Sequence, residues 1–133
     1  MQLKGKCVLI TGAGSGIGRA LAVEAARRGM TAALCGRRAD ALAQTAALLG
    51  AGTAHIVIQA DVTRPDARRM LVDRIRERWG KLDVLINNAG IAGPTGRVDT
   101  LSALEVDRTI DVNLKSQFYF LERCTPLLAA SKR

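Results

Sequence analysis

Aromatic side chains are scarce in this chain, which has one Trp, one Tyr and two Phe among its 133 residues. Proteins that bind single-stranded nucleic acids stack the bases on aromatic side chains, so the shortage argues against that class of protein. A net charge of +8 would favour a nucleic-acid partner, but the basic residues are spread over several predicted helices. We therefore predict no nucleic-acid partner, although a basic nucleic-acid-binding domain stays an alternative.

The one dense basic stretch begins at Arg68 and ends at Lys81. It lies in a predicted helix whose apolar side chains recur every four residues, namely Ala67, Leu71, Ile75 and Trp79. Basic residues between such positions are typical of the polar face of a surface helix. We therefore predict that the basic side chains of this stretch, Arg68 included, are solvated.

The chain also lacks a run of about 20 apolar residues, so we predict no membrane span. Its first residues pass from Lys4 and Lys6 directly into an apolar strand, and this order does not fit a secretion signal. The three cysteines, Cys7, Cys35 and Cys124, are odd in number and have no metal-binding spacing. We expect buried, reduced thiols, a cytoplasmic protein and no metal site.

What the chain does have is a glycine cluster directly after an apolar segment. Residues 7–11 form the apolar run, and glycines occupy every second position from Gly12 to Gly18. Glycine tolerates positive φ and has no Cβ, so the backbone N–H groups of such a loop can approach a pyrophosphate. The helix predicted at about 17–28 adds its positive N-terminal end. This order predicts a dinucleotide-binding loop, with a glycine turn that binds nothing as the alternative.

Strand-like and helix-like segments alternate along the whole chain. Strands are predicted near 6–11, 31–36, 55–60 and 83–87, with helices after each of them. Thr63 is predicted to cap the third helix, with Pro65 in its first turn. The last helix is predicted to span about 102–130, with a break or bend near Pro126. Strands separated by helices imply a parallel sheet, and the length of 133 residues predicts a single domain.

Four short motifs follow one another on these elements. They are Thr11-Gly12-x-x-x-Gly16-x-Gly18 after the first strand, Asp61-Val62 after the third, Asn87-Asn88-Ala89-Gly90 after the fourth, and Asp111-Val112-Asn113 in the last helix. With these motifs in this order, the chain resembles the classical short-chain dehydrogenase/reductase family over its whole length. The resemblance implies an α/β fold of the Rossmann type. Its doubly wound parallel sheet would have the order 3-2-1-4, with the cleft at the carboxyl ends of strands one and four.

The resemblance also implies which residues hold the cofactor. The phosphate loop would comprise Gly12, Ser15, Gly16, Ile17 and Gly18. The cofactor cleft would be lined by Asn88, Ala89 and Gly90.

Two further motifs would act at the adenine and at the reacting end. By resemblance, Asp61 accepts a hydrogen bond from the adenine amino group, and Val62 packs nearby. Asn113 would belong to the catalytic group, where its backbone helps to hold a water in a proton relay. From the residues alone, Asp61 could instead cap a helix, Asn87 and Asn88 could be turn residues, and Asn113 could face solvent.

The cofactor preference is predicted from the end of the second strand, which reads Gly36-Arg37-Arg38. Dinucleotide folds that use NAD usually have an acid in this region, where it binds the ribose 2′-hydroxyl. Here two arginines stand where a 2′-phosphate would lie, so we predict that NADP(H) is preferred over NAD(H), mainly through Arg37. The alternatives are that both arginines are surface residues, or that Asp40 pairs with one of them.

The catalytic serine and the Tyr-x-x-x-Lys pair of the family have no counterpart here. In the family they follow a fifth strand, whereas this chain ends at Arg133. Arg123 lies four positions after Tyr119, but both come soon after Asn113 in the same predicted helix, so we interpret them as surface or interface residues.

We therefore expect a domain truncated before strand five, with an incomplete sheet. By resemblance it is the cofactor-binding half of an oxidoreductase that moves a hydride between NADP(H) and an alcohol or carbonyl substrate. We expect the 133-residue chain alone to be inactive. The alternative is a non-catalytic dinucleotide-binding module that is complete at this length.

The last predicted helix carries more apolar surface than one sheet face needs. The side chains concerned are Leu114, Phe118, Leu121 and Leu128. In the family this helix commonly packs against its symmetry mate, so the resemblance implies a homodimer or homotetramer through residues 102–130.

Overall fold

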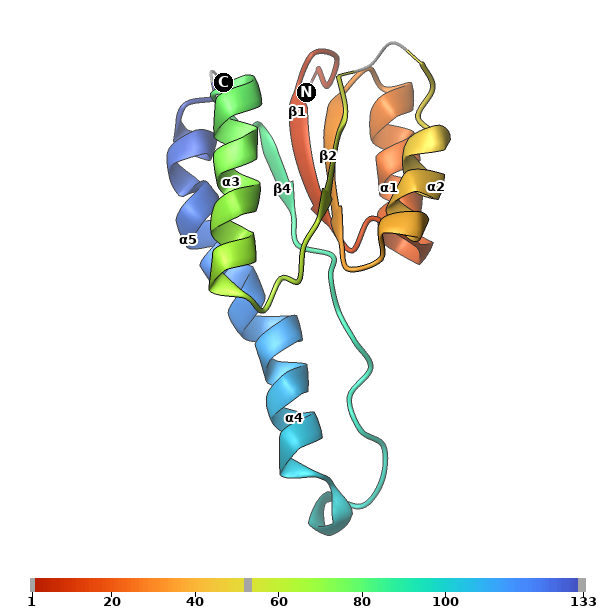
Figure 1. Cartoon of the computed structure of the whole chain (residues 1–133), viewed down its shortest axis with the longest axis vertical. Coiled ribbons are helices and arrows are strands. Elements are labelled where there is room, and N and C mark those ends of the chain that lie inside the picture. The colour runs from red at the N-terminus through yellow and green to blue at the C-terminus, as the bar shows by residue number, and fades with distance from the viewer. Residues whose placement is uncertain (1, 52–53, 132–133) are drawn as a thin grey trace.

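A parallel sheet of four strands forms the middle of the molecule (Figure 1). The computed structural model describes residues 2–51 and 54–131. In the sheet order β3-β2-β1-β4, the strands are Ile56–Gln59, Thr31–Gly36, Cys7–Thr11 and Val84–Ile86. All neighbouring strands in this sheet are parallel. The predicted sheet order and strand directions are confirmed.

Helices cover both faces of the sheet (Figure 1). α1 (Gly16–Arg27) and α2 (Ala39–Ala47) lie on one face. α3 (Pro65–Trp79) and α5 (Ser116–Ala129) lie on the other. This arrangement is the doubly wound architecture predicted from the resemblance.

Each face of the sheet has its own hydrophobic core. Successive side chains of a strand point to opposite faces, and β1 shows this directly. Val8 and Ile10 belong to the core under α1 and α2, whereas Leu9 belongs to the core under α3 and α5. Leu42 of α2 and Phe120 of α5 are fully buried in these two cores. An apolar strand with no polar face is therefore the expected sequence for β1.

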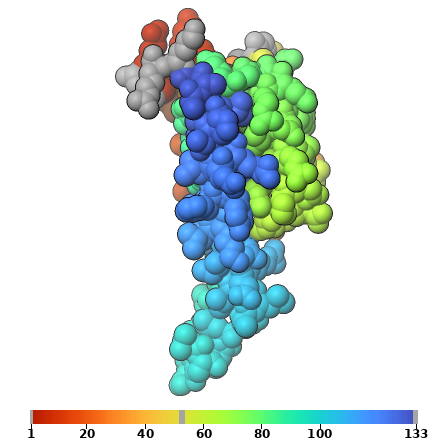
Figure 2. Space-filling view, turned by 90° about the vertical axis from the view of Figure 1, so that its left-hand side faces the viewer, coloured from red at the N-terminus to blue at the C-terminus, as the bar shows by residue number. Residues whose placement is uncertain are grey.

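A long arm leaves the sheet after β4 and returns as a helix. An extended loop leads to the short 3₁₀ turn η1 (Val98–Thr100), then α4 (Ala103–Ile110) and the π-helical turn η2 (Asp111–Lys115), which joins α5. This part projects from the body of the molecule (Figure 2), and no residue of α4 is buried. The predicted break near Pro126 is wrong, because α5 continues through Pro126, and the irregular turn lies at η2 instead.

The start of α3 also differs from the prediction. The N-cap residue is Arg64, and Thr63, the predicted cap, lies in the preceding turn. The amide and the hydroxyl of Thr63 both donate to one carboxylate oxygen of Asp61, over 2.9 and 2.7 Å. An aspartate that accepts a bond from the backbone two residues later closes an Asx turn, which takes Thr63 out of the cap position. Pro65 occupies the first helical turn as predicted.

The basic stretch on α3 is solvated only in part. Its exposed arginines are Arg69, Arg74, Arg76 and Arg78. Arg68, in contrast, is 5% exposed, so the prediction that it is solvated is wrong. The helical period explains the difference, because Arg68 precedes Leu71 by three residues and Ile75 by seven. All three side chains therefore lie on the buried side of the helix.

The three cysteines are buried and free, as expected for thiols that fill the core. Burial raises the pKa of Cys35 to about 12 and that of Cys124 to about 11, so both stay protonated at neutral pH. Among the described residues, no cluster of side chains could hold a metal ion. No helix in the same part of the chain is long and apolar enough to cross a membrane.

A buried carboxylate joins the start of β1 to the end of α5. The side chain of Asp83 is 4% exposed and pairs with Lys6 over 3.1 Å and with Lys81 over 3.3 Å. It also accepts hydrogen bonds from the amide of Cys7, over 2.8 Å, and from the hydroxyl of Ser131. Burial raises the pKa of Asp83, but these hydrogen bonds outweigh it and hold the pKa well below the ordinary range.

Candidate functional site

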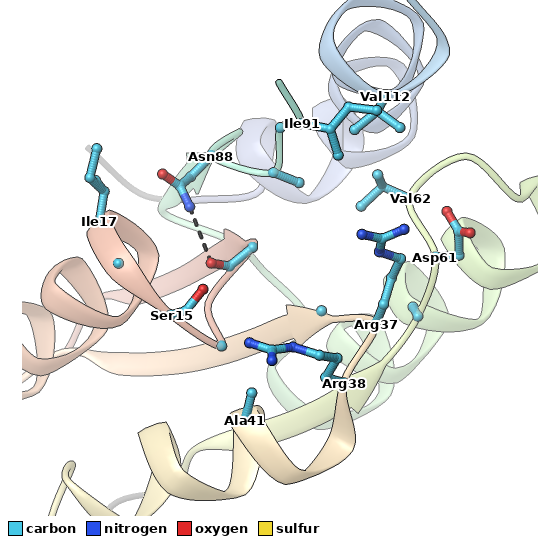
Figure 3. Close-up of a pocket in the computed structure, with 17 residues that line it drawn as sticks. Ser15, Ile17, Arg37, Arg38, Ala41, Asp61, Val62, Asn88, Ile91 and Val112 are labelled. Carbon is cyan, nitrogen blue, oxygen red and sulfur yellow. Dashed lines mark hydrogen bonds between the residues drawn. The ribbon is translucent and has the colours of Figure 1, made fainter. Parts of the chain in front are cut away.

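A cavity of about 520 Å³ opens at the carboxyl ends of β1 and β4 (Figure 3). In an open parallel sheet this is the switch point at which ligands bind. All the residues predicted to hold the cofactor, except Gly18, line this cavity: Gly12, Ser15, Gly16, Ile17, Arg37, Arg38, Asp61, Val62, Asn88, Ala89 and Gly90. The lining residues that were not predicted are Gly14, Gly36, Ala41, Ala60, Ile91 and Val112. Most of these are direct neighbours of a predicted residue in the chain.

The glycine loop after β1 leaves the start of α1 open to the cavity. Gly12 and Gly16 have φ angles of 65° and 51°, a conformation that favours glycine. Ser15 occupies the N-cap position of α1, yet its side chain makes no cap hydrogen bond. The first N–H groups of the helix therefore have no side-chain cap. An anion at this end of the cavity would be stabilised by those groups and by the helix dipole.

Gly18 lies beneath this loop, not in the cavity wall. A Cβ on Gly18 would lie 2.1 Å from the carbonyl oxygen of Gly12 and 2.6 Å from Nδ2 of Asn88. No side chain fits at that distance, so only glycine allows α1 to approach the loop this closely. The structure therefore assigns Gly18 a supporting position under the predicted phosphate loop.

Hydrogen bonds join the glycine loop to the segment after β4. Nδ2 of Asn88 donates to the carbonyl oxygen of Thr11 over 3.0 Å. It also donates to the carbonyl oxygen of Gly12 over 3.2 Å, and this is the bond drawn in Figure 3. The hydroxyl oxygen of Thr11 accepts the amides of Asn88 and Ala89 over 3.0 and 2.9 Å. Asn88 is therefore more than a turn residue. Thr11 opens the first motif but was given no role in the predicted site, and the structure shows that its hydroxyl holds the segment after β4.

Asp61 lies on the other side of the cavity from Ile17 (Figure 3). Burial raises the pKa of Asp61, but the hydrogen bonds from Thr63 and the charges of Arg37 and Arg64 outweigh it and lower the pKa. The carboxylate is therefore ionised at neutral pH. It closes the turn before α3 and still lines the cavity, where it can accept a hydrogen bond from an amino group of a ligand.

Arg37 and Arg38 extend into different parts of the cavity. In Figure 3, Arg37 points toward Val62, whereas Arg38 lies over Ala41 on the side of Ser15. A ligand in the cavity can therefore meet one guanidinium near the Asp61–Val62 wall and the other near the glycine loop.

The two arginines are available to a ligand. Nε2 of Gln59 donates to the carbonyl oxygen of Arg37 over 2.9 Å and fixes its backbone. Within the described residues, neither the Arg37 nor the Arg38 guanidinium has a hydrogen bond or an ion pair. The alternative that Asp40 pairs with one of them is therefore not found in this part of the chain.

Asn113 lies on η2 and holds a loop that borders the cavity. Its side-chain oxygen accepts the amide of Ile91 over 2.9 Å, and its side-chain amide donates to the carbonyl oxygen of Ile91, also over 2.9 Å. The alternative that Asn113 faces solvent is therefore wrong. Asn113 does not line the cavity itself, but it supports Ile91, which does.

Tyr119 does not line this cavity, and its ring contacts Arg68 of α3. Its side chain is 42% exposed, and the guanidinium carbon of Arg68 lies 4.6 Å from the centre of its ring. Arg123, four positions later, is exposed as well. Both placements agree with the interpretation of Tyr119 and Arg123 as surface residues.

Comparison with known protein families shows to which family the chain that forms this cavity belongs. A family model described as short chain dehydrogenase matches residues 6–133. The chain belongs to the short-chain dehydrogenase family. The resemblance that was based on four motifs is thereby confirmed, and short-chain dehydrogenases are oxidoreductases that bind NAD(H) or NADP(H).

Individual short-chain dehydrogenases align with most of this chain. A 3beta-hydroxysteroid dehydrogenase of Mediterraneibacter gnavus is 43% identical over 115 residues, which are 86% of this chain and 42% of that protein. An NADPH-dependent pterin aldehyde reductase of Arabidopsis thaliana is 34% identical over 128 residues, which are 96% of this chain and 53% of that protein.

A solved structure of a reductase also matches most of this chain. The 3-ketoacyl-(acyl-carrier-protein) reductase from Brucella melitensis, complexed with NADH, superposes with a TM-score of 0.87 at 30% identity. The superposition covers 94% of this chain and 51% of the reductase. The chain therefore spans about half the length of the relatives that it matches.

Proposed function

We propose that this chain is the cofactor-binding part of an NADP(H)-dependent oxidoreductase, which transfers a hydride between the nicotinamide and an alcohol or carbonyl carbon. The observation that carries the proposal is the cavity, in which the glycine loop, Asp61 and two arginines surround one space. The open start of α1 suits the pyrophosphate, and Asp61 with Val62 suits the adenine. Asn88 and its neighbours line the remaining wall, along which the nicotinamide ribose would lie.

The preference for NADP(H) rests on Arg37 and Arg38. The 2′-phosphate is the only group that distinguishes the two cofactors. Both guanidinium groups line the cavity, and neither has a hydrogen bond or an ion pair among the described residues. A hydrogen bond to a charged group contributes about 1.5–3 kcal/mol, which corresponds to a preference of roughly tenfold to a hundredfold. The NADPH dependence of the Arabidopsis thaliana relative supports this preference. Since another relative was solved with NADH, the proposal depends on the arginines and not on the family.

Titration of NADPH and NADH into the chain tests the proposal. The unmodified chain should bind NADPH at least about tenfold more tightly than NADH. Arg37→Asp should weaken NADPH binding by more than about tenfold and leave NADH binding within about threefold, because the new carboxylate repels only the phosphate. Arg38→Asp compares the second arginine, and Arg78→Asp is the matched control at an exposed arginine outside the cavity. Equal losses for both cofactors, or tight binding of NADH by the unmodified chain, would contradict the preference.

We propose that the chemical step uses groups that these 133 residues do not contain. The serine and the Tyr-x-x-x-Lys pair of short-chain dehydrogenases have no counterpart here, and general acid–base help of this kind contributes about 10²–10⁴-fold. We propose that Asn113 joins the catalytic group of a longer protein through its backbone, and its two hydrogen bonds to Ile91 support a fixed position for it. The chain alone is expected to bind the cofactor without turning over a substrate.

We also propose that the protein is a homodimer or homotetramer through residues 102–130. Leu114 of η2 and Phe118 and Leu121 of α5 are 58%, 72% and 51% exposed, and large apolar side chains exposed together are typical of an interaction surface. Leu128, predicted for the same surface, packs against the core beneath α3 and α5 and does not belong to it.

The buried, unpaired cysteines support a reducing compartment, and we propose the cytoplasm.

A further inference from the structure

Arg68 is a charged side chain in a position where the rest of its helix face is apolar. It is 5% exposed, beside Leu71 and Ile75 on the buried side of α3. A guanidinium with only methylenes around it would be strongly destabilising, because burial removes it from water. The groups around Arg68 must therefore stabilise its charge in this buried position.

The Arg68 guanidinium makes one hydrogen bond and one contact with an aromatic ring. Nη1 donates to the carbonyl oxygen of Val62 over 2.8 Å. The guanidinium carbon lies 4.6 Å from the centre of the Tyr119 ring, so the group stacks on an aromatic face of α5. Nε is buried and has no hydrogen-bond partner. Burial lowers the pKa of Arg68, and the nearby charge of Arg123 lowers it as well, although Tyr119 acts in the opposite direction.

The carbonyl that Arg68 holds belongs to Val62, a residue of the cavity wall. Val62 and its neighbour Asp61 both line the cavity, and the turn that they form continues into Thr63, whose amide bonds Asp61. That turn has no strand on its outer side, since β3 ends at Gln59 and lies at the edge of the described sheet. Arg68 therefore ties this wall to α3 and, through Tyr119, to α5.

We propose that Arg68 is a positioning residue for the adenine end of the cofactor, which it reaches through the carbonyl oxygen of Val62. The inference rests on the proposed function, because it concerns how the same cavity binds a dinucleotide. The incomplete hydrogen bonding of Arg68 disfavours the folded state, so a merely stabilising role explains its presence poorly. A fixed Asp61–Val62 wall explains it better, since a preformed wall reduces the ordering that the ligand must impose.

The test compares Arg68→Met with Arg69→Met in the 133-residue chain, using adenosine 2′,5′-bisphosphate as the probe. Met has a similar length and no charge, so Arg68→Met keeps the packing and removes the bond to Val62. Replacement of a buried charge by an apolar side chain is often neutral or stabilising, so the unfolding midpoint in urea should stay equal or rise. The affinity for the probe should nevertheless fall roughly three- to thirtyfold. Arg69→Met removes an exposed arginine of the same helix and should change neither quantity.

Hydrogen exchange adds a readout that shows where the change occurs. The amide of Thr63, which bonds Asp61, should exchange faster in Arg68→Met than in the unmodified chain. The amides of β1 should exchange at unchanged rates, because β2 separates β1 from β3, the strand that leads into this turn. Arg68→Lys keeps a cationic donor and should recover part of the lost affinity.

Each result has one meaning. A lower unfolding midpoint in parallel with weaker binding would overturn the positioning role in favour of a structural one. Unchanged affinity in Arg68→Met would overturn it while leaving the proposed function intact. If the unmodified chain bound neither the probe nor NADPH, the proposed function itself would fail, and the positioning role with it.

Discussion

Gly18→Ala should destabilise the chain and impair cofactor binding, because a methyl group does not fit where α1 meets the glycine loop. The added Cβ would lie 2.1 Å from the carbonyl oxygen of Gly12 and 2.6 Å from Nδ2 of Asn88. Since Cβ contacts essentially never fall below 3.0 Å, the Gly12 carbonyl would have to move by roughly 1 Å in a closely packed region.

The magnitude follows from two costs. Overpacking of a well-packed region costs about 1–3 kcal/mol. Displacement of the Gly12 carbonyl also breaks its 3.2 Å bond from Asn88, and such a bond contributes about 0.5–1.5 kcal/mol. The free energy of unfolding should therefore fall by about 2–4 kcal/mol, out of about 5–15 kcal/mol for a typical domain.

Urea denaturation followed by the fluorescence of Trp79, the only tryptophan, measures this change. Gly16→Ala is the matched control, because its Cβ would meet nothing within 4 Å and its φ of 51° is the only obstacle. Left-handed backbone costs a non-glycine residue about 1–2 kcal/mol. A Gly18→Ala protein within about 0.5 kcal/mol of the unmodified chain, or one more stable than Gly16→Ala, would refute the steric argument.

Three further predictions follow from features described above. Because the pKa of Asp83 is lowered in the folded state, its stabilisation is present above the unfolded-state pKa of about 3.9 and is lost as the pH falls toward the lower folded-state value. Asp83→Asn should therefore flatten the decline of the urea midpoint below about pH 4, and equal declines in both proteins would contradict this. Phe118→Glu should convert the oligomer of the longer protein to a monomer in size-exclusion chromatography, whereas an unmodified protein that is already monomeric at roughly tens of micromolar would exclude the proposed interface. The 133-residue chain should oxidise no NADPH above background with a panel of ketones, and turnover that disappears in Tyr119→Phe would show that the catalytic group has been misplaced.

The location of the candidate site could be predicted because its motifs follow the ends of strands. Gly12, Asp61 and Asn88 come shortly after β1, β3 and β4, and parallel strands bring their carboxyl ends to one edge of the sheet. The type of each element and the order of the motifs were therefore sufficient to predict that these residues share one site.

The contacts that hold the site could not be predicted in the same way. The hydrogen bond between Ala89 and Thr11 joins two residues that are 78 positions apart in the sequence, and no local sequence pattern predicts such a pair. Arg68 was assigned to solvent because it lies between Ala67 and Leu71, two positions of the apolar series that was predicted to form the buried face. The buried face of α3 is centred differently and includes Arg68, three residues before Leu71 and seven before Ile75.

The central position of β1 has a consequence for the order of events during synthesis. Ile10 lies opposite Leu34 of β2 and Ile86 of β4, so its two partners are made 24 and 76 residues later. At translation rates of about 5–20 residues per second, the second partner follows Ile10 by between about 4 and 15 s. During that interval one edge of an apolar strand has no neighbour, and unpaired strand edges promote aggregation.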